Sequence, residues 1–145
     1  MKEELRIFLT TLKYYTRIPV PNSVQLSPEY LHKATRYFPF IGWIVGLCAA
    51  LVFIGVKNVL PISIGVMAAI VVGIIITGAF HENGLARVCD AFSEGWTKPQ
   101  ILRILHQKKL NTYGVTGLLA LLLCKFLALY GLAVFNSSLV VFSLL

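Results

Sequence analysis

Apolar residues fall into three long stretches along the chain, separated by short polar segments. Residues 38–56 and 58–80 carry no charged side chain, and residues 115–145 carry only Lys125. A helix needs about 20 predominantly apolar residues to cross the hydrocarbon core of a bilayer. The pattern therefore predicts transmembrane helices over about 38–56, 59–80 and 115–134, and the start of a fourth near 135–145.

The connections between these stretches predict how the spans are arranged. The linker that joins the first two spans, around residues 57–61, is very short, which favours an antiparallel helical hairpin. The last stretch runs to VVFSLL without a polar tail. Because a helix that ends inside a bilayer is unusual, the pattern suggests that the chain is part of a longer protein.

The first segment of the chain has the pattern of an amphipathic helix that lies in the membrane interface. Pro19 and Pro21 are expected to end it, because proline lacks the backbone donor that a helix needs. A second short helix is expected from Ser27, which can cap it, to Tyr37. The apolar side of the first helix is predicted from residues at helical spacing, namely Leu5, Phe8, Leu9, Leu12 and Thr16.

Composition supports a membrane protein. The chain is 57% hydrophobic and only 13% charged, with a mean hydropathy of +0.79, whereas soluble domains are about 25% charged. Its net charge of +7 lies in two basic patches beside apolar runs, without the aromatic interleaving of a nucleic-acid-binding protein. The expected fold is an all-α, polytopic integral membrane helical bundle, a single domain over residues 1–145 with an N-terminal interfacial amphipathic helix.

Lysine and arginine also predict the orientation of the spans. The first 37 residues and the segment 81–114 are rich in both, whereas the turn between the first two spans has only Lys57. Because basic loops stay in the cytoplasm, both basic segments are expected on that side. The isolated Lys125 either reaches toward an interface or faces the bundle interior and pairs with an acid.

The polar segment 81–114 holds most of the unusual side chains. If it begins as a helix, Asn83, Arg87 and Asp90 share one face at spacing i, i+4 and i+7. A polar face at the end of a membrane bundle is a candidate ligand site. The alternative is a solvated loop in which Arg87 pairs with Asp90. The HENGL sequence is not the zinc motif HExxH, since Leu85 replaces the second histidine.

Four pieces of the chain form a longer pattern. They are YYTRIPVP (14–21), RYFPFIGWIVGL (36–47), TGAFHENGLARVCDAFSEGWTKPQILRIL (77–105) and NTYGVTGLLALLLCKFLAL (111–129). In this order and spacing they resemble the cobalamin synthase family, adenosylcobinamide-GDP ribazoletransferase. Members of that family are longer, so the chain is similar to their N-terminal part. The resemblance implies a multi-pass enzyme of the bacterial or archaeal cytoplasmic (inner) membrane.

The resemblance also implies an activity. Such enzymes join adenosylcobinamide-GDP and α-ribazole, or its phosphate, into adenosylcobalamin or its 5′-phosphate and release GMP, the last step of nucleotide-loop assembly. Mg²⁺ is the implied cofactor, and the two small molecules and the lipid bilayer are the implied partners. No nucleic acid is expected, and a homo-oligomer is left open. The alternatives are an inactive or truncated homologue that retains the fold, and a small membrane transport or scaffold protein.

The resemblance assigns roles to residues of the polar segment and of the N-terminal region. Glu82, Asp90 and His81 are the implied catalytic residues. Arg17, Lys108, Lys109 and Thr112 are the implied ligands of substrate phosphate. The implied metal ligands are Glu82, Asp90 and Asn83.

The chain departs from the family pattern at several acidic positions. The family motif reads approximately HEDGLADxxDG, where this chain has HENGLARVCDA, so Asn83 and Arg87 replace aspartates. Gln107 also stands where the family usually has aspartate. At roughly 4 Å and an effective dielectric near 20, two unit charges interact by about 4 kcal/mol before solvent screening. Because arginine stays charged, Arg87 is expected to weaken metal binding and turnover, and to pair with Asp90 instead.

Overall fold

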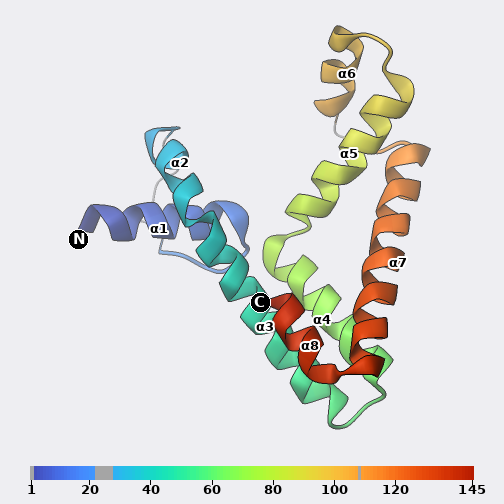
Figure 1. Cartoon of the computed structure of the whole chain (residues 1–145). Coiled ribbons are helices and arrows are strands. Elements are labelled where there is room, and N and C mark those ends of the chain that lie inside the picture. The colour runs from blue at the N-terminus through green and yellow to red at the C-terminus, as the bar shows by residue number, and fades with distance from the viewer. Residues whose placement is uncertain (1, 22–27, 108) are drawn as a thin grey trace. The chain divides into compact units, whose positions relative to one another are not determined.

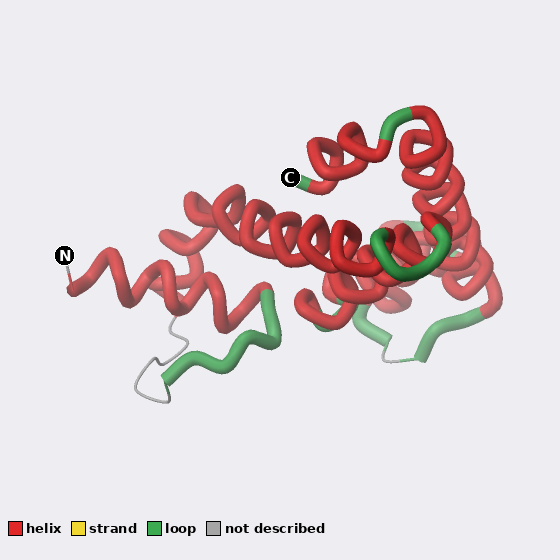
Figure 2. The backbone as a smooth tube through the Cα atoms, turned by 90° about the horizontal axis from the view of Figure 1, so that it is seen from below, coloured by secondary structure: helices red, strands yellow, loops and turns green. Residues whose placement is uncertain are grey.

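The computed structural model describes residues 2–21, 28–107 and 109–145, and all its regular elements in these ranges are helical. Figure 1 labels the helices, and Figure 2 shows that loops alone connect them within the described part of the chain. The chain divides into two units, the first formed by residues up to Gly78 together with Tyr130–Leu145, and the second by Ala79–Leu129. The elements are α1 (Lys2–Tyr15), α2 (Pro28–Ala34), the 3₁₀ helix η1 (Thr35–Tyr37), α3 (Phe38–Lys57), α4 (Ile62–Thr77), α5 (Phe80–Glu94), α6 (Lys98–Leu105), α7 (Thr112–Phe135) and α8 (Ser137–Leu144).

Helices α3 and α4 pack against each other and form the core of the first unit. Phe53 of α3 is fully buried, and a Cβ atom added at Gly65 of α4 would lie 3.3 Å from its ring. Small residues allow such close approach where lipid gives no hydrophobic driving force between helices. The other buried side chains of the pair are Ile41, Ala49, Ala50, Val66, Ala69 and Ile70.

Helix α8 belongs to the same unit and packs on α3. A Cβ atom at Gly46 would collide with the carbonyl group of Leu144, so the two helices meet where α3 has no side chain. At the other end, the Lys57 ammonium donates to the Ser137 hydroxyl over 3.1 Å. The terminal segment after α7 is therefore part of the first unit.

Helix α1 is amphipathic as predicted, and Thr16, the last residue of the predicted apolar side, is buried just after it. Ile7, Thr10 and Thr11 are buried, whereas Leu5 is 59% exposed. The threonines can be buried because their hydroxyls donate to backbone carbonyls one turn earlier. The Thr11 hydroxyl also lies 3.2 Å from the carbonyl oxygen of Ala34, which holds α1 against α2. The predicted cap at Ser27 lies outside the described residues.

Two helices are long and apolar enough to cross a membrane, His32–Lys57 and Thr112–Phe135. The predicted span 59–80 corresponds to α4, which has 16 residues and is shorter than the roughly 20 that a straight span needs. It passes the same test only together with α5, as one bent span. The break lies at Gly78 and Ala79, whose φ angles are 64° and 58°. These helices confirm an all-α membrane bundle; the interfacial position of α1 stays a prediction.

The exposed Glu4 carboxylate ties α1 to η1. It accepts a hydrogen bond from the Tyr37 hydroxyl over 2.6 Å and forms an ion pair with Arg36. The pKa of the Glu4 carboxyl is lowered, first by the Tyr37 hydroxyl and then by the Arg36 guanidinium. Because the folded pKa is the lower one, these bonds contribute fully above the unfolded value of about 4.3 and are lost as the pH falls through the folded value.

We expect the exchange protection of α1 to fall in acid, and Glu4→Gln to remove most of that pH dependence. Hydrogen–deuterium exchange of the detergent-solubilised protein on both sides of about pH 4 measures it. Glu3→Gln is the matched control, since Glu3 makes only an exposed pair with Lys33 at 3.4 Å. Equal acid sensitivity in Glu4→Gln and wild type would contradict the assignment.

Candidate functional site

Helix α5 carries four predicted site residues, His81, Glu82, Asn83 and Asp90, and packs against α6. Helix α6 begins with a capping box, in which the Gln100 side-chain oxygen accepts from the backbone N–H of Thr97 over 3.1 Å. Gly95 permits the tight turn between the helices, because a Cβ atom there would lie 2.7 Å from the Ile101 side chain. The segment predicted as a polar loop is thus largely a pair of short helices.

Asp90 is the buried acid of the second unit. Asp90 is only 3% exposed. Its two carboxylate oxygens accept hydrogen bonds from the backbone N–H groups of Asn111 over 2.8 Å and Gly114 over 2.5 Å. The first N–H groups of a helix have no partner within it. The Asp90 carboxylate therefore caps the start of α7 from a neighbouring helix, and its charge suits the positive end of the helix dipole.

Two glycines let α7 approach α5 at this cap. A Cβ atom at Gly114 would lie 2.7 Å from the Ala86 carbonyl oxygen, and one at Gly117 would lie 2.5 Å from the Cys89 sulfur. Both distances are shorter than real contacts allow. The close approach brings the Gly114 N–H within reach of Asp90.

Glu94 lies one turn after Asp90 and holds the same segment. The Asn111 side-chain amide donates to its two carboxylate oxygens over 2.9 and 2.8 Å. Sequence reasoning did not select Glu94, although its i+4 spacing from Asp90 on a helix was a usable signal. Asn111 is therefore fixed through its backbone by Asp90 and through its side chain by Glu94.

The predicted ion pair between Arg87 and Asp90 is wrong. The Arg87 guanidinium donates to the Asn83 side-chain oxygen over 3.3 Å and to the Leu105 carbonyl oxygen over 3.4 Å. Leu105 ends α6, and the carbonyl end of a helix attracts cations. Asp90 is turned to α7, so Arg87 ties α5 to α6 instead.

Glu82 differs from these acids. One of its carboxylate oxygens is buried and, among the described residues, has no hydrogen-bond partner. With a rise of 1.5 Å per residue, the eight positions from Glu82 to Asp90 span about 12 Å of helix, too far for both carboxylates to bind one ion. Nor do the described residues gather three His, Cys, Asp or Glu side chains around any one point. A magnesium site that combines the Glu82 and Asp90 carboxylates does not fit this structure.

The remaining predicted residues are spread over both units. Lys109 and Thr112 are exposed beside the start of α7, and the exposed His81 stacks edge-on against Phe80 with ring centroids 5.5 Å apart. Arg17 belongs to the first unit, where its backbone N–H donates to the Ile76 carbonyl over 2.7 Å. Lys108 lies outside the described residues. The roles of these five residues stay predictions.

Comparison with known proteins gives a family for this arrangement. A sequence model of cobalamin-5-phosphate synthase matches residues 7–145. This chain belongs to the cobalamin-5-phosphate synthase family. An adenosylcobinamide-GDP ribazoletransferase of Shewanella baltica is 42% identical over 144 residues, which is 96% of this chain and 55% of that protein. Its namesakes in Shewanella frigidimarina and Shewanella sp. strain ANA-3 are 42% and 40% identical over 92% of this chain.

The family match covers only part of the relatives. This member of the cobalamin-5-phosphate synthase family spans about half the length of the curated relatives it matches. No solved structure matches it. The α5–α6 pair and the start of α7 lie inside the matched range, so the Asp90 cap belongs to the part of the chain that the family model covers.

We expect Asp90→Ala to destabilise the fold by about 1–3 kcal/mol for each buried N–H group that loses its acceptor. Asp90→Asn keeps one acceptor oxygen and should retain part of that stability. Thermal unfolding of the purified protein in detergent measures both. If Asp90→Ala unfolds at the wild-type temperature, the capping role is wrong.

A second pair of variants tests the close approach of α7. Gly114→Ala should lower the unfolding temperature, because its Cβ atom has no room beside Ala86. Gly84→Ala is the matched control on α5, where an added Cβ atom meets nothing within 4 Å and should stabilise the helix by up to about 1 kcal/mol. Equal behaviour of the two variants would contradict the packing argument.

Proposed function

We propose that this chain takes part in the transferase reaction of its relatives, the union of adenosylcobinamide-GDP with α-ribazole or its phosphate. The observation that carries the proposal is the family match over residues 7–145. The membrane-spanning helices support it, because a bulky, partly lipophilic corrinoid suits a site beside a bilayer. We also propose that the N-terminus and the α5–α6 pair face the cytoplasm, on the basis of their lysines and arginines.

The reaction transfers the cobinamide-phosphate group from GMP to a hydroxyl group of the ribazole. The hydroxyl oxygen of the ribazole sugar bonds to the phosphorus that carries the cobinamide. The bridging P–O bond of the diphosphate breaks, and its electron pair leaves with GMP. The hydroxyl proton must pass to a base. Catalysis of such a transfer rests mainly on positioning and on stabilising charge at the phosphate oxygens.

We propose Glu82 as the proton acceptor. Its buried oxygen without a partner in the described residues supports this role, because that oxygen keeps its lone pairs available to accept a proton. Asp90 is better regarded as a positioning residue, since both of its oxygens cap α7. Lys109 and Thr112 lie beside that capped end and are proposed to contact substrate phosphate.

Magnesium enters the proposal only with the substrate. Mg²⁺ binds through one or two carboxylates together with waters and substrate phosphates, and it would offset charge on the phosphate oxygens. Because Glu82 and Asp90 cannot share one ion, we propose that any magnesium arrives on the diphosphate. Arg87, held by Asn83 and Leu105, stands where the family motif has a further acid and is expected to weaken binding of the ion.

We expect Glu82→Gln to lower kcat by about 10²–10⁴, the usual range for loss of a general base. GMP release from adenosylcobinamide-GDP with α-ribazole, measured in detergent or nanodiscs, tests this. Glu3→Gln, a change at an exposed surface pair, should leave kcat unchanged. Wild-type turnover in Glu82→Gln would refute the assigned role.

Restoring the acids of the family motif should increase magnesium affinity. The double variant Asn83→Asp, Arg87→Asp places two carboxylates one turn apart, where they can share an ion. We expect at least a roughly tenfold lower magnesium concentration for half-maximal GMP release, since the change replaces a cation by an anion. Arg87→Ala removes the cation and its contacts without adding a carboxylate and serves as the control, with a smaller shift expected. An equal shift in both would show that the added carboxylates do not bind the ion.

The GMP-release assay also distinguishes two alternative functions. A homologue that keeps only the fold would bind the corrinoid without releasing GMP. A small transport or scaffold protein would show neither, and solute flux in reconstituted vesicles would favour transport. Of these three functions, the family match supports the transferase reaction best.

A further inference from the structure

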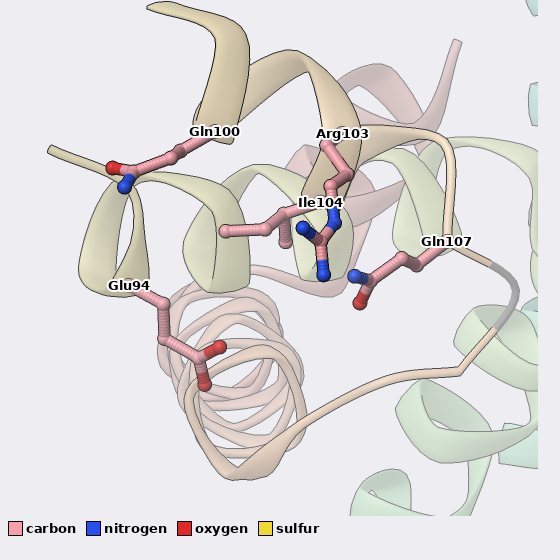
Figure 3. A pocket seen from close by; sticks show the side chains of 5 residues that line it. All are labelled: Glu94, Gln100, Arg103, Ile104 and Gln107. Carbon is pink, nitrogen blue, oxygen red and sulfur yellow. The ribbon is translucent and has the colours of Figure 1, made fainter. Parts of the chain in front are cut away.

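A polar cavity of about 270 Å³ lies between α6 and the end of α5. Its lining residues are Glu94, Gln100, Arg103, Ile104 and Gln107. Figure 3 shows the side chains of Arg103, Ile104 and Gln107 directed into one space, with Glu94 across from them. Gln100, Arg103 and Ile104 share one face of α6 through their spacing of i, i+3 and i+4. The whole cavity lies within the second unit.

Two oppositely charged side chains, Glu94 and Arg103, line this cavity but do not form an ion pair with each other. The ion pairs found among the described residues are Lys33–Glu3 and Arg36–Glu4, so Glu94 and Arg103 do not neutralise each other. The Asn111 amide fixes the Glu94 carboxylate, yet a carboxylate has about four lone-pair positions and keeps acceptor capacity. Arg103 offers five N–H donors in a planar fork, and no hydrogen bond of its side chain is found in the described part of the chain.

We propose that this cavity binds a guanine base. Guanine presents acceptors at O6 and N7, which match an arginine fork, and donors at N1 and the 2-amino group, which match a carboxylate. Ile104 supplies an apolar surface for the ring. Adenine would turn its 6-amino donor toward Arg103, and hypoxanthine lacks the 2-amino donor for Glu94. A phosphate group fits less well, because the Glu94 carboxylate would repel it. This inference rests on the proposed function, in which the substrate is a GDP ester.

Calorimetric titration of the whole chain in detergent with GDP, IDP and ADP tests the inference. GDP should bind at least about tenfold more tightly than ADP, the effect of one good bidentate contact. Glu94→Gln should lower the ratio of GDP to IDP affinity, because an amide oxygen is a weaker acceptor for the 2-amino group than a carboxylate. Arg103→Ala should lower the ratio of GDP to ADP affinity by about tenfold, because the contact to O6 and N7 is lost.

Two further variants make the outcome decisive. Arg103→Lys keeps the charge but loses the fork, so guanine selectivity should fall although nucleotide binding persists. Lys98→Ala changes an exposed residue of α6 outside the cavity and should leave all three affinities unchanged. If Arg103→Ala weakens GDP and ADP equally, Arg103 binds phosphate and the inference is overturned.

The same variants separate this inference from the proposed function. If wild type releases GMP but both cavity variants keep full guanine selectivity, the cavity assignment fails and the transferase function stands. If wild type binds GDP selectively, loses that selectivity in both variants and releases no GMP, the cavity assignment stands and the transferase function fails.

Discussion

The second unit depends on one buried carboxylate that holds the start of a long apolar helix. Asp90 accepts from the Asn111 and Gly114 N–H groups, which would otherwise have no partner within α7. An aspartate in the middle of one helix thus caps another that begins more than twenty positions later. The contact needs Gly114, because any larger residue would strike the Ala86 carbonyl. It fixes where α7 begins and therefore where the exposed Lys109 and Thr112 lie.

The acidic residues of α5 differ in whether they bond to the start of α7. Asp90 and Glu94 face the start of α7 and are bonded there, whereas Glu82, two turns earlier, keeps a buried oxygen without a partner in the described residues. The family motif would place further acids at positions 83 and 87. Here the Arg87 guanidinium donates to the Asn83 side-chain oxygen on α5 and to the Leu105 carbonyl oxygen at the end of α6. Arg87 therefore joins the two short helices. The same residue that ties α5 to α6 is the one proposed to weaken magnesium binding.

Much of the fold followed from the sequence, because hydrophobic length is a strong signal in a membrane protein. The apolar stretch that begins at Phe38 predicted α3, and the amphipathic pattern of the N-terminal segment predicted α1. The pattern selected Thr16, which the structure buries, but it did not select the buried Thr10 and Thr11. Hydropathy does not identify these two residues, whereas their hydroxyls can be buried because they bond to carbonyls of their own helix. The span at 59–80 was drawn too long, because Gly78 and Ala79 take left-handed conformations that apolar counting does not register.

The sequence by itself determined the fold class, the family and the helix that carries the candidate site. Spacing within one helix is a local property, so it placed Asn83, Arg87 and Asp90 on neighbouring turns of α5. Only the tertiary structure decided which partner each side chain takes. It gave Asp90 to the backbone of α7, Arg87 to the end of α6 and Glu94 to Asn111, since these partners come from other elements and local spacing cannot specify them. The same packing creates the cavity between Glu94 and Arg103, two residues that belong to different helices.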